Sequence, residues 1–184
     1  MEALLVIDTL EDFFVDGLLK DRRQTLVNST NKLIEWARSR SVQVIWVRQE
    51  FAQDLSDAFL VMRKRNIRIT MKGTPGAEVL GELDRRDEDL EVIKKRYSAF
   101  FRTELDELLR RHAITHLYLA GVNTHACIRT AAIDAYQRDL NVTIVENCVS
   151  SQDDEHHEVT LRYLGKEIAS VVSLDCVINK DGTA

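Results

Sequence analysis

Side chains that can carry covalent chemistry follow several short apolar runs of this sequence. Asp8, the adjacent pair Lys94 and Lys95, and Cys127 each lie at or shortly after the end of such a run. A carboxylate can accept a thiol proton and later deliver it to a leaving amine, while a nearby ammonium favours the thiolate form of a cysteine. If these side chains meet, they form an Asp-Lys-Cys apparatus suited to acyl transfer.

The residues around Cys127 indicate how its thiol could be activated. The segment 123–127, of sequence NTHAC, leads into a stretch with helical spacing, and Thr124 is a suitable N-cap residue. Cys127 then falls in the first helical turn, where free N–H groups and the helix dipole favour an anion, so we expect a lowered thiol pKa. Backbone N–H groups of the same turn could stabilise the oxyanion of a tetrahedral intermediate.

The elements that must position these residues are predicted by an alternation of apolar runs with segments of helical period. Nearly continuous apolar runs are typical of parallel strands covered on both faces, so the chain is predicted to be α/β with a six-stranded, mostly parallel sheet. The predicted strands are 3–7, 42–47, 90–93, 116–122, 142–145 and 168–174. Ligands bind beyond the carboxyl ends of such strands, which is where the acid, the amine and the thiol lie.

Length and composition bound the remaining possibilities. The 184 residues carry 25 Lys and Arg against 30 Asp and Glu, a net charge of −5, which excludes a basic nucleic-acid binder. One proline and seven glycines leave no material for a linker, so residues 1–184 are predicted to form one domain. No apolar run is long enough for a membrane span and no signal peptide is evident, so we expect a cytoplasmic protein.

The cysteines and the connection 49–73 need separate interpretations. Three cysteines without a CxxC pair make a disulfide framework improbable, and Cys148 and Cys176 are expected to be packing residues.

The connection 49–73 breaks the alternation of apolar runs and helical segments and carries four basic residues within 63–68. These form either a solvated helix face or a specificity lid that meets an acidic substrate group. Pro75 then suits the first position of a helix.

Several separated motifs resemble the isochorismatase-like cysteine hydrolases. They are "LLVIDTLEDFF" around Asp8, "KGTPGAEVLGEL", "VIKKRYSAFFRTELDELL" and "LYLAGVNTHACIRTAAIDAYQRD" around Cys127. The resemblance covers nearly the whole chain in the same order. It implies a three-layer Rossmann-like fold and a catalytic triad of Asp8, Lys94 and Cys127.

The choice of lysine rests on this resemblance. Lys94 and Lys95 would project to opposite sides of an extended strand. In the family the catalytic lysine stands three residues before the tyrosine of the Tyr-Ser-Ala-Phe segment, here Tyr97, which selects Lys94 and leaves Lys95 as the structural alternative. The resemblance also implies a cis peptide before Asn123 and an oxyanion hole formed by the N–H groups of Asn123 and Cys127.

Other residues are assigned with a structural alternative beside each. Four are candidates for lining the substrate pocket, with core packing or a helix-start role as the alternative: Phe13, Tyr97, Phe100 and His125. Asp12 matches the family's Asp-Phe pair and is expected to be a turn or cap residue. Leu10 stands where family members commonly have glutamine, a departure that affects contacts near the first strand.

The histidines argue against one branch of the family. Nicotinamidases have an Asp-x-His metal motif after the second strand, whereas no histidine lies within 49–73. No metal and no cofactor are therefore expected. The cluster Glu155-His156-His157 is expected to lie on a helix surface, since adjacent histidines on a helix point apart.

The sequence thus predicts a cysteine hydrolase that cleaves a C–N bond of a small amide, carbamoyl or ureido substrate through a thioester on Cys127. Family members that cleave the vinyl ether of isochorismate generally lack this cysteine; such a hydrolase, with Asp8 as the acid, is the alternative. A non-catalytic binding domain on the same fold is a third, although no glycine-rich phosphate-binding segment follows any strand. The resemblance further implies a homo-oligomer, a dimer or tetramer, without nucleic-acid or membrane partners.

Overall fold

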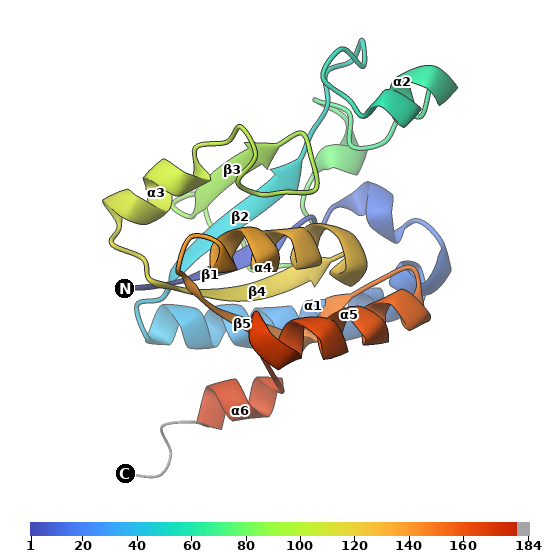
Figure 1. Ribbon diagram of the computed structural model, residues 1–184. Helices are drawn as coiled ribbons and strands as arrows, with labels where there is room; N and C mark the ends of the chain where they lie inside the picture. The colour runs from blue at the N-terminus through green and yellow to red at the C-terminus, as the bar shows by residue number, and fades with distance from the viewer. Residues whose placement is uncertain (180–184) are drawn as a thin grey trace.

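Six parallel strands form one sheet in the order β3-β2-β1-β4-β5-β6 (Figure 1). The computed structural model describes residues 1–179. The strands are β1 (Glu2–Ile7), β2 (Gln43–Gln49), β3 (Leu90–Lys94), β4 (His116–Val122), β5 (Asn141–Ser150) and β6 (Ser170–Val172). The chain runs outward from β1 to β3 and then returns to β4 on the other side of β1. The switch point between β1 and β4 is where ligands bind in open parallel sheets.

Helices cover both faces of the sheet. They are α1 (Gly17–Ser39), α2 (Leu60–Arg65), α3 (Leu105–Arg111), α4 (Arg129–Tyr136), α5 (Asp154–Glu167) and α6 (Leu174–Asn179). Helices α3, α4 and α5 pack on one face with Leu5 and Ile7, while α1 and α6 pack on the other with Leu4 and Val6. This alternation along β1 follows from the two-residue period of a strand. The predicted three-layer α/β fold is confirmed.

Two predicted strand boundaries are wrong. The fifth strand continues to Ser150, well beyond the predicted 142–145. The predicted strand 168–174 is reduced to β6, because α5 extends to Glu167 and α6 begins at Leu174. A short apolar run does not by itself distinguish strand from helix. Here the Ser173 hydroxyl accepts a hydrogen bond from the N–H of Cys176 and so caps the start of α6.

This change also corrects the expectation for Cys176. It lies exposed on α6 rather than packed beside a strand, whereas Cys148 is fully buried in β5 as expected. No helix of residues 1–179 combines the length and the apolar character that a membrane span requires.

The connection 49–73 folds into a small unit of its own beyond the carboxyl ends of β2 and β3 (Figure 1). It buries a separate apolar cluster formed by Phe51, Leu55, Ala58, Met62 and Met71. The basic residues 63–65 are exposed on α2, as expected of a solvated helix face. Pro75 occupies the start of a short 3-10 helix, Pro75–Ala77, as predicted.

Candidate active site

Asp8, Lys94 and Cys127 meet beyond the carboxyl ends of β1, β3 and β4. The Lys94 ammonium lies between the other two, with Nζ 2.6 Å from Asp8 Oδ2 and 3.5 Å from Cys127 Sγ. All three are buried, with 1%, 0% and 5% of their surfaces exposed. Lys94 also donates to the carbonyl of Arg96 at 3.1 Å, so its position is fixed by three partners.

The backbone at the end of β1 aims the acid. Asp8 adopts a left-handed conformation, with φ of 54°, which aspartate tolerates better than most residues. Its N–H donates to the carbonyl of Val47 at 2.8 Å, and its Oδ1 accepts from the N–H of Gln49 at 2.8 Å. The first bond fixes the backbone of Asp8 against β2 and the second holds Oδ1, which leaves Oδ2 to face Lys94.

A π-helical turn, Thr124–Ile128, carries the thiol into α4. The carbonyl of Asn123 accepts from the N–H of Ala126 at 3.0 Å and from that of Ile128 at 3.3 Å. The residue that precedes the helix is therefore Asn123 and not Thr124, so the predicted N-cap is wrong: the Thr124 hydroxyl donates instead to the carbonyl of Ser150 at 3.0 Å. The Val122–Asn123 peptide is cis, as the resemblance implied.

Burial decides the protonation state of the thiol. Removal from water raises the pKa of Cys127 to about 12; the Lys94 charge opposes this shift, and the Asp8 carboxylate adds to it. The expectation of a lowered thiol pKa is therefore wrong, because desolvation outweighs the nearby ammonium. Burial alone would lower the pKa of Lys94, but the Asp8 and Cys127 charges outweigh it and the pKa is raised. Burial thus favours the neutral thiol at Cys127, while the contact with Asp8 favours the ammonium form of Lys94.

Comparison with known proteins identifies the family to which this fold belongs. The family model described as the isochorismatase domain matches residues 2–176. The chain belongs to the isochorismatase family. An Arabidopsis thaliana protein described as a probable inactive nicotinamidase is 34% identical over 167 residues, which cover 86% of this chain and 85% of that protein. The family resemblance noted from the motifs is confirmed.

Two solved structures share this fold over nearly their full length. An isochorismatase family protein from Desulfovibrio vulgaris is 28% identical with a TM-score of 0.88, and the match covers 97% of this chain and 96% of that one. An N-carbamoylsarcosine amidase from Thermoplasma acidophilum is also 28% identical, with a TM-score of 0.80 and coverage of 95% and 98%. The relatives of this chain are thus hydrolases that include amidases.

Within this isochorismatase fold, the two adjacent lysines are separated by the strand geometry. Lys94 points toward Cys127, whereas the Lys95 ammonium binds the carbonyl of Glu50 and lies 3.1 Å from a carboxylate oxygen of Asp57. Lys95 therefore ties the connection 49–73 to the end of β3. Lys95, the alternative to Lys94, therefore has a different role.

The four candidate lining residues fall into two pairs. Tyr97 and His125 line a hollow of about 470 Å³ beside the π-helical turn and α4. Phe100 is buried in the core on the α4 face, with the Arg138 guanidinium carbon 4.3 Å from its ring centre, and Phe13 packs partly buried against the α1 side. The structure therefore favours the packing alternative for Phe13 and Phe100.

The residues expected to be structural have identifiable partners. Asp12 Oδ2 accepts from the N–H of Thr70 at 2.6 Å, which fastens the connection 49–73 to the loop after β1. The two histidines at the start of α5 point apart: His156 lies 2.9 Å from Asp153, and His157 lies 2.9 Å from the Thr124 hydroxyl.

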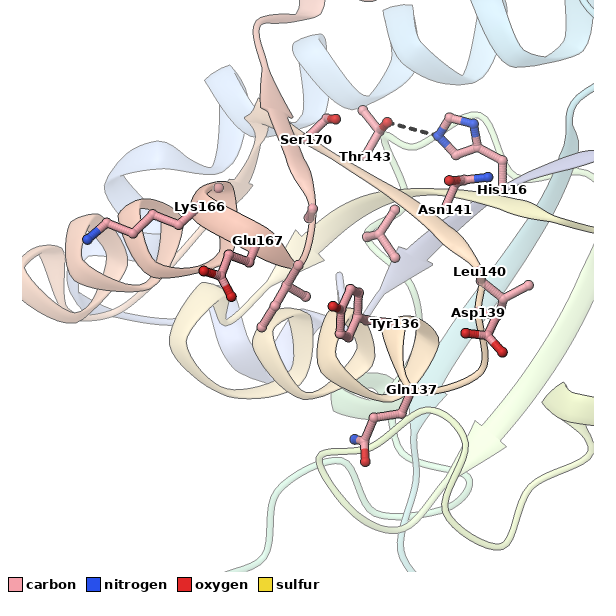
Figure 2. Close-up of a pocket in the computed structure, with 14 residues that line it drawn as sticks. His116, Tyr136, Gln137, Asp139, Leu140, Asn141, Thr143, Lys166, Glu167 and Ser170 are labelled. Atoms are coloured by element: carbon pink, nitrogen blue, oxygen red, sulfur yellow. Dashed lines mark hydrogen bonds between the residues drawn. The ribbon is translucent and has the colours of Figure 1, made fainter.

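A hollow of about 850 Å³ lies at the opposite end of the sheet (Figure 2). Its walls include His116, Asn141 and Ser170, the first residues of β4, β5 and β6. His116 Nε2 and the Thr143 hydroxyl are 2.9 Å apart within it. None of its lining residues belongs to the Asp8, Lys94 and Cys127 cluster.

Several contributors to the site could not be found from residue types. The Gln49 N–H and the Arg96 carbonyl are backbone groups, which every residue has, so no sequence signal distinguishes them. Ser150 and His157 contact the turn that carries the thiol and lie far from it in sequence.

Proposed function

We propose that this chain is a cysteine hydrolase that cleaves a C–N bond of a small amide, carbamoyl or ureido substrate through a thioester on Cys127. The observation that carries the proposal is the buried Lys94 ammonium in contact with both the Asp8 carboxylate and the Cys127 sulfur. An ion pair that only stabilised the fold would not require a thiol beside it. A buried thiol beside a buried carboxylate is, in contrast, a nucleophile with its base.

The proposed reaction has two halves. The Cys127 proton passes to Asp8 as sulfur attacks the substrate carbonyl, and Lys94 stabilises the developing thiolate. The N–H groups of Asn123 and Cys127 stabilise the oxyanion, the C–N bond breaks, and Asp8 returns its proton to the leaving amine. Water, deprotonated by Asp8, then attacks the thioester, and the sulfur leaves as the thiol. No cofactor takes part in either half.

The raised thiol pKa fits a mechanism in which proton transfer and attack are coupled. A thiol with a pKa near 12 is protonated at neutral pH, so it needs an adjacent base at the moment of attack. Tyr97 and His125, which line one hollow, are proposed to contact the substrate, and the unit 49–73 is proposed to act as a specificity lid.

The decisive experiment replaces single cysteines. We expect Cys127→Ser to lose turnover of a primary amide, a carbamoyl amino acid or a ureido acid, measured as ammonia release, with an unchanged unfolding temperature. Cys176→Ser is the matched control and should keep full activity, because Cys176 is exposed on α6. Full activity of Cys127→Ala would overturn the proposed mechanism.

Alkylation separates this proposal from vinyl-ether hydrolysis. Loss of activity in step with modification of Cys127 by iodoacetamide at pH 9, and protection by substrate, supports the thioester route. Cleavage of an isochorismate-like acid that persists after complete modification of Cys127 would favour acid catalysis by Asp8.

A further inference from the structure

Three consecutive residues ahead of the nucleophile are held by the connection between β5 and α5. Asn123 Oδ1 accepts from the Gln152 N–H at 2.9 Å, and the Thr124 hydroxyl donates to the Ser150 carbonyl at 3.0 Å. His125 Nδ1 and the Ser151 hydroxyl are hydrogen bonded at 2.6 Å. The turn that carries Cys127 is therefore held from outside the triad, by residues 150–152.

His157 completes this arrangement, and the proton positions follow from its partners. The Ser150 carbonyl can only accept a hydrogen bond, so the single Thr124 hydroxyl proton points toward it. The hydroxyl oxygen must then accept from His157 Nδ1, which lies 2.9 Å away. The neutral imidazole is thus held in the tautomer that carries its proton on Nδ1.

The surroundings of His157 favour its neutral form. Burial lowers the pKa of His157, the Arg22 charge lowers it further, and Asp154, Glu158 and Glu146 oppose these shifts. The imidazole is therefore neutral near pH 7. Protonation at lower pH adds a proton at Nε2 and leaves the Nδ1 donor intact, so the bond to Thr124 persists in both forms.

We propose that His157 is a positioning residue that holds the Cys127 turn through the Thr124 hydroxyl, by donating from Nδ1. The proposal rests on the cysteine hydrolase function above for its effect on turnover. Its effect on the turn itself is independent of any substrate. Thr124 is fully buried and His157 is partly buried, so removing the imidazole takes away a donor to a buried hydroxyl.

Substitutions at two positions test the donor. An asparagine side chain presents an N–H near the place of Nδ1, whereas glutamine reaches toward the place of Nε2. We expect His157→Ala and His157→Gln to lower kcat roughly 100-fold, with KM changed less than about threefold, because a displacement of about 1 Å at a nucleophile has this size of effect. His157→Asn should stay within about threefold of the unsubstituted protein. Thr124→Val should match His157→Ala, and Thr124→Ser should retain activity.

Hydrogen exchange gives the readout that needs no substrate. The N–H groups of residues 126 and 128 are bonded to the Asn123 carbonyl, so a loosened turn should exchange them faster in a peptide that spans 123–130. We expect faster exchange in His157→Ala and unchanged exchange in His157→Asn and in the control His112→Ala, which alters a histidine at the end of α3. If Cys127→Ala proved fully active, the proposed function would fail while this readout still decided the present proposal.

Two results would overturn the inference. One is unchanged kcat together with unchanged exchange of 123–130 in His157→Ala. The other is equal impairment of His157→Asn and His157→Gln with an equal loss of unfolding temperature, which would mean that His157 acts only through packing.

Discussion

At the scale of single residues, the buried pair of Asp8 and Lys94 has charges that depend on one another. The two groups are 2.6 Å apart and almost fully buried. Removing one partner of such a pair leaves an uncompensated charge away from water, whereas removing both charges can be nearly neutral.

Lys94→Met should therefore destabilise the protein by about 3–5 kcal/mol, measured from urea unfolding. The double variant Asp8→Asn with Lys94→Met should recover most of this stability loss. Both the single and the double variant should lose activity. Lys95→Met is the matched control and should cost less than about 1 kcal/mol, because its pair with Asp57 is partly exposed. Additive effects of the two substitutions would contradict a coupled pair.

The pKa of Cys127 gives a second prediction. Because burial raises it from 9.0 to about 12, the thiolate fraction in the free protein at pH 8 is smaller than that of an ordinary thiol. Alkylation of Cys127, followed by mass spectrometry, should therefore be slower than that of a cysteine in a short peptide. Its rate should still increase between pH 9 and pH 11, and a rate that levels off below pH 8 would contradict the raised pKa.

At the scale of elements, the approach of β4 to β1 depends on Gly121. This residue has a φ of +119°, and a Cβ there would lie 1.9 Å from the carbonyl oxygen of Ile7. Both strands lead directly into the site, β1 to Asp8 and β4 to the Cys127 turn.

Gly121→Ala should separate β1 from β4 and cost at least about 3 kcal/mol, since it combines a steric overlap with a backbone conformation unfavourable for alanine. Gly81→Ala is the control, because a Cβ at Gly81 meets no atom within 4 Å. Thermal unfolding of both variants measures the difference. A Gly121→Ala protein as stable as Gly81→Ala would show that the strands can separate without cost.

The unit 49–73 should behave as a separately opening element. Its apolar cluster is small, and the Asp12 carboxylate fastens it through the Thr70 N–H. Small clusters open with lower free energy than the central strands. Hydrogen exchange should be faster in residues 53–70 than in β1 and β4. Asp12→Ala should further increase the exchange rate in residues 66–72 and leave the rates elsewhere unchanged. Equal exchange of this unit and β4 would contradict the prediction.

At the scale of the whole molecule, several large apolar side chains are exposed, and some of them line one hollow. Leu60, Val61, Tyr97 and Phe101 are each about half exposed, and Phe59, Tyr97 and Phe101 line a hollow together. Exposed apolar groups that lie together are typical of an association surface. We expect sedimentation to give about two or four times the chain mass of 21.1 kDa, and a monomer at micromolar concentration would contradict this.

Much of the site was predictable from residue types and local spacing. Alternating apolar runs predicted the parallel sheet, and a carboxylate, an amine and a thiol at the ends of different strands predicted their meeting. Parallel strands bring their carboxyl ends to one edge, so Asp8, Lys94 and Cys127 converge without a detailed knowledge of packing. The prediction of one strand over 168–174 was wrong, because a short apolar run is compatible with either a strand or a helix until its tertiary contacts are known.

The tertiary structure alone decided the protonation of Cys127 and the support of its turn. The sequence places the thiol at a helix start near a lysine, which favours a thiolate, yet desolvation is a property of the surrounding atoms and outweighs both. The link from His157 through Thr124 to Ser150 likewise joins residues from three segments. Local sequence determined which chemical groups are available, while the folded packing determined their charge states and their orientation.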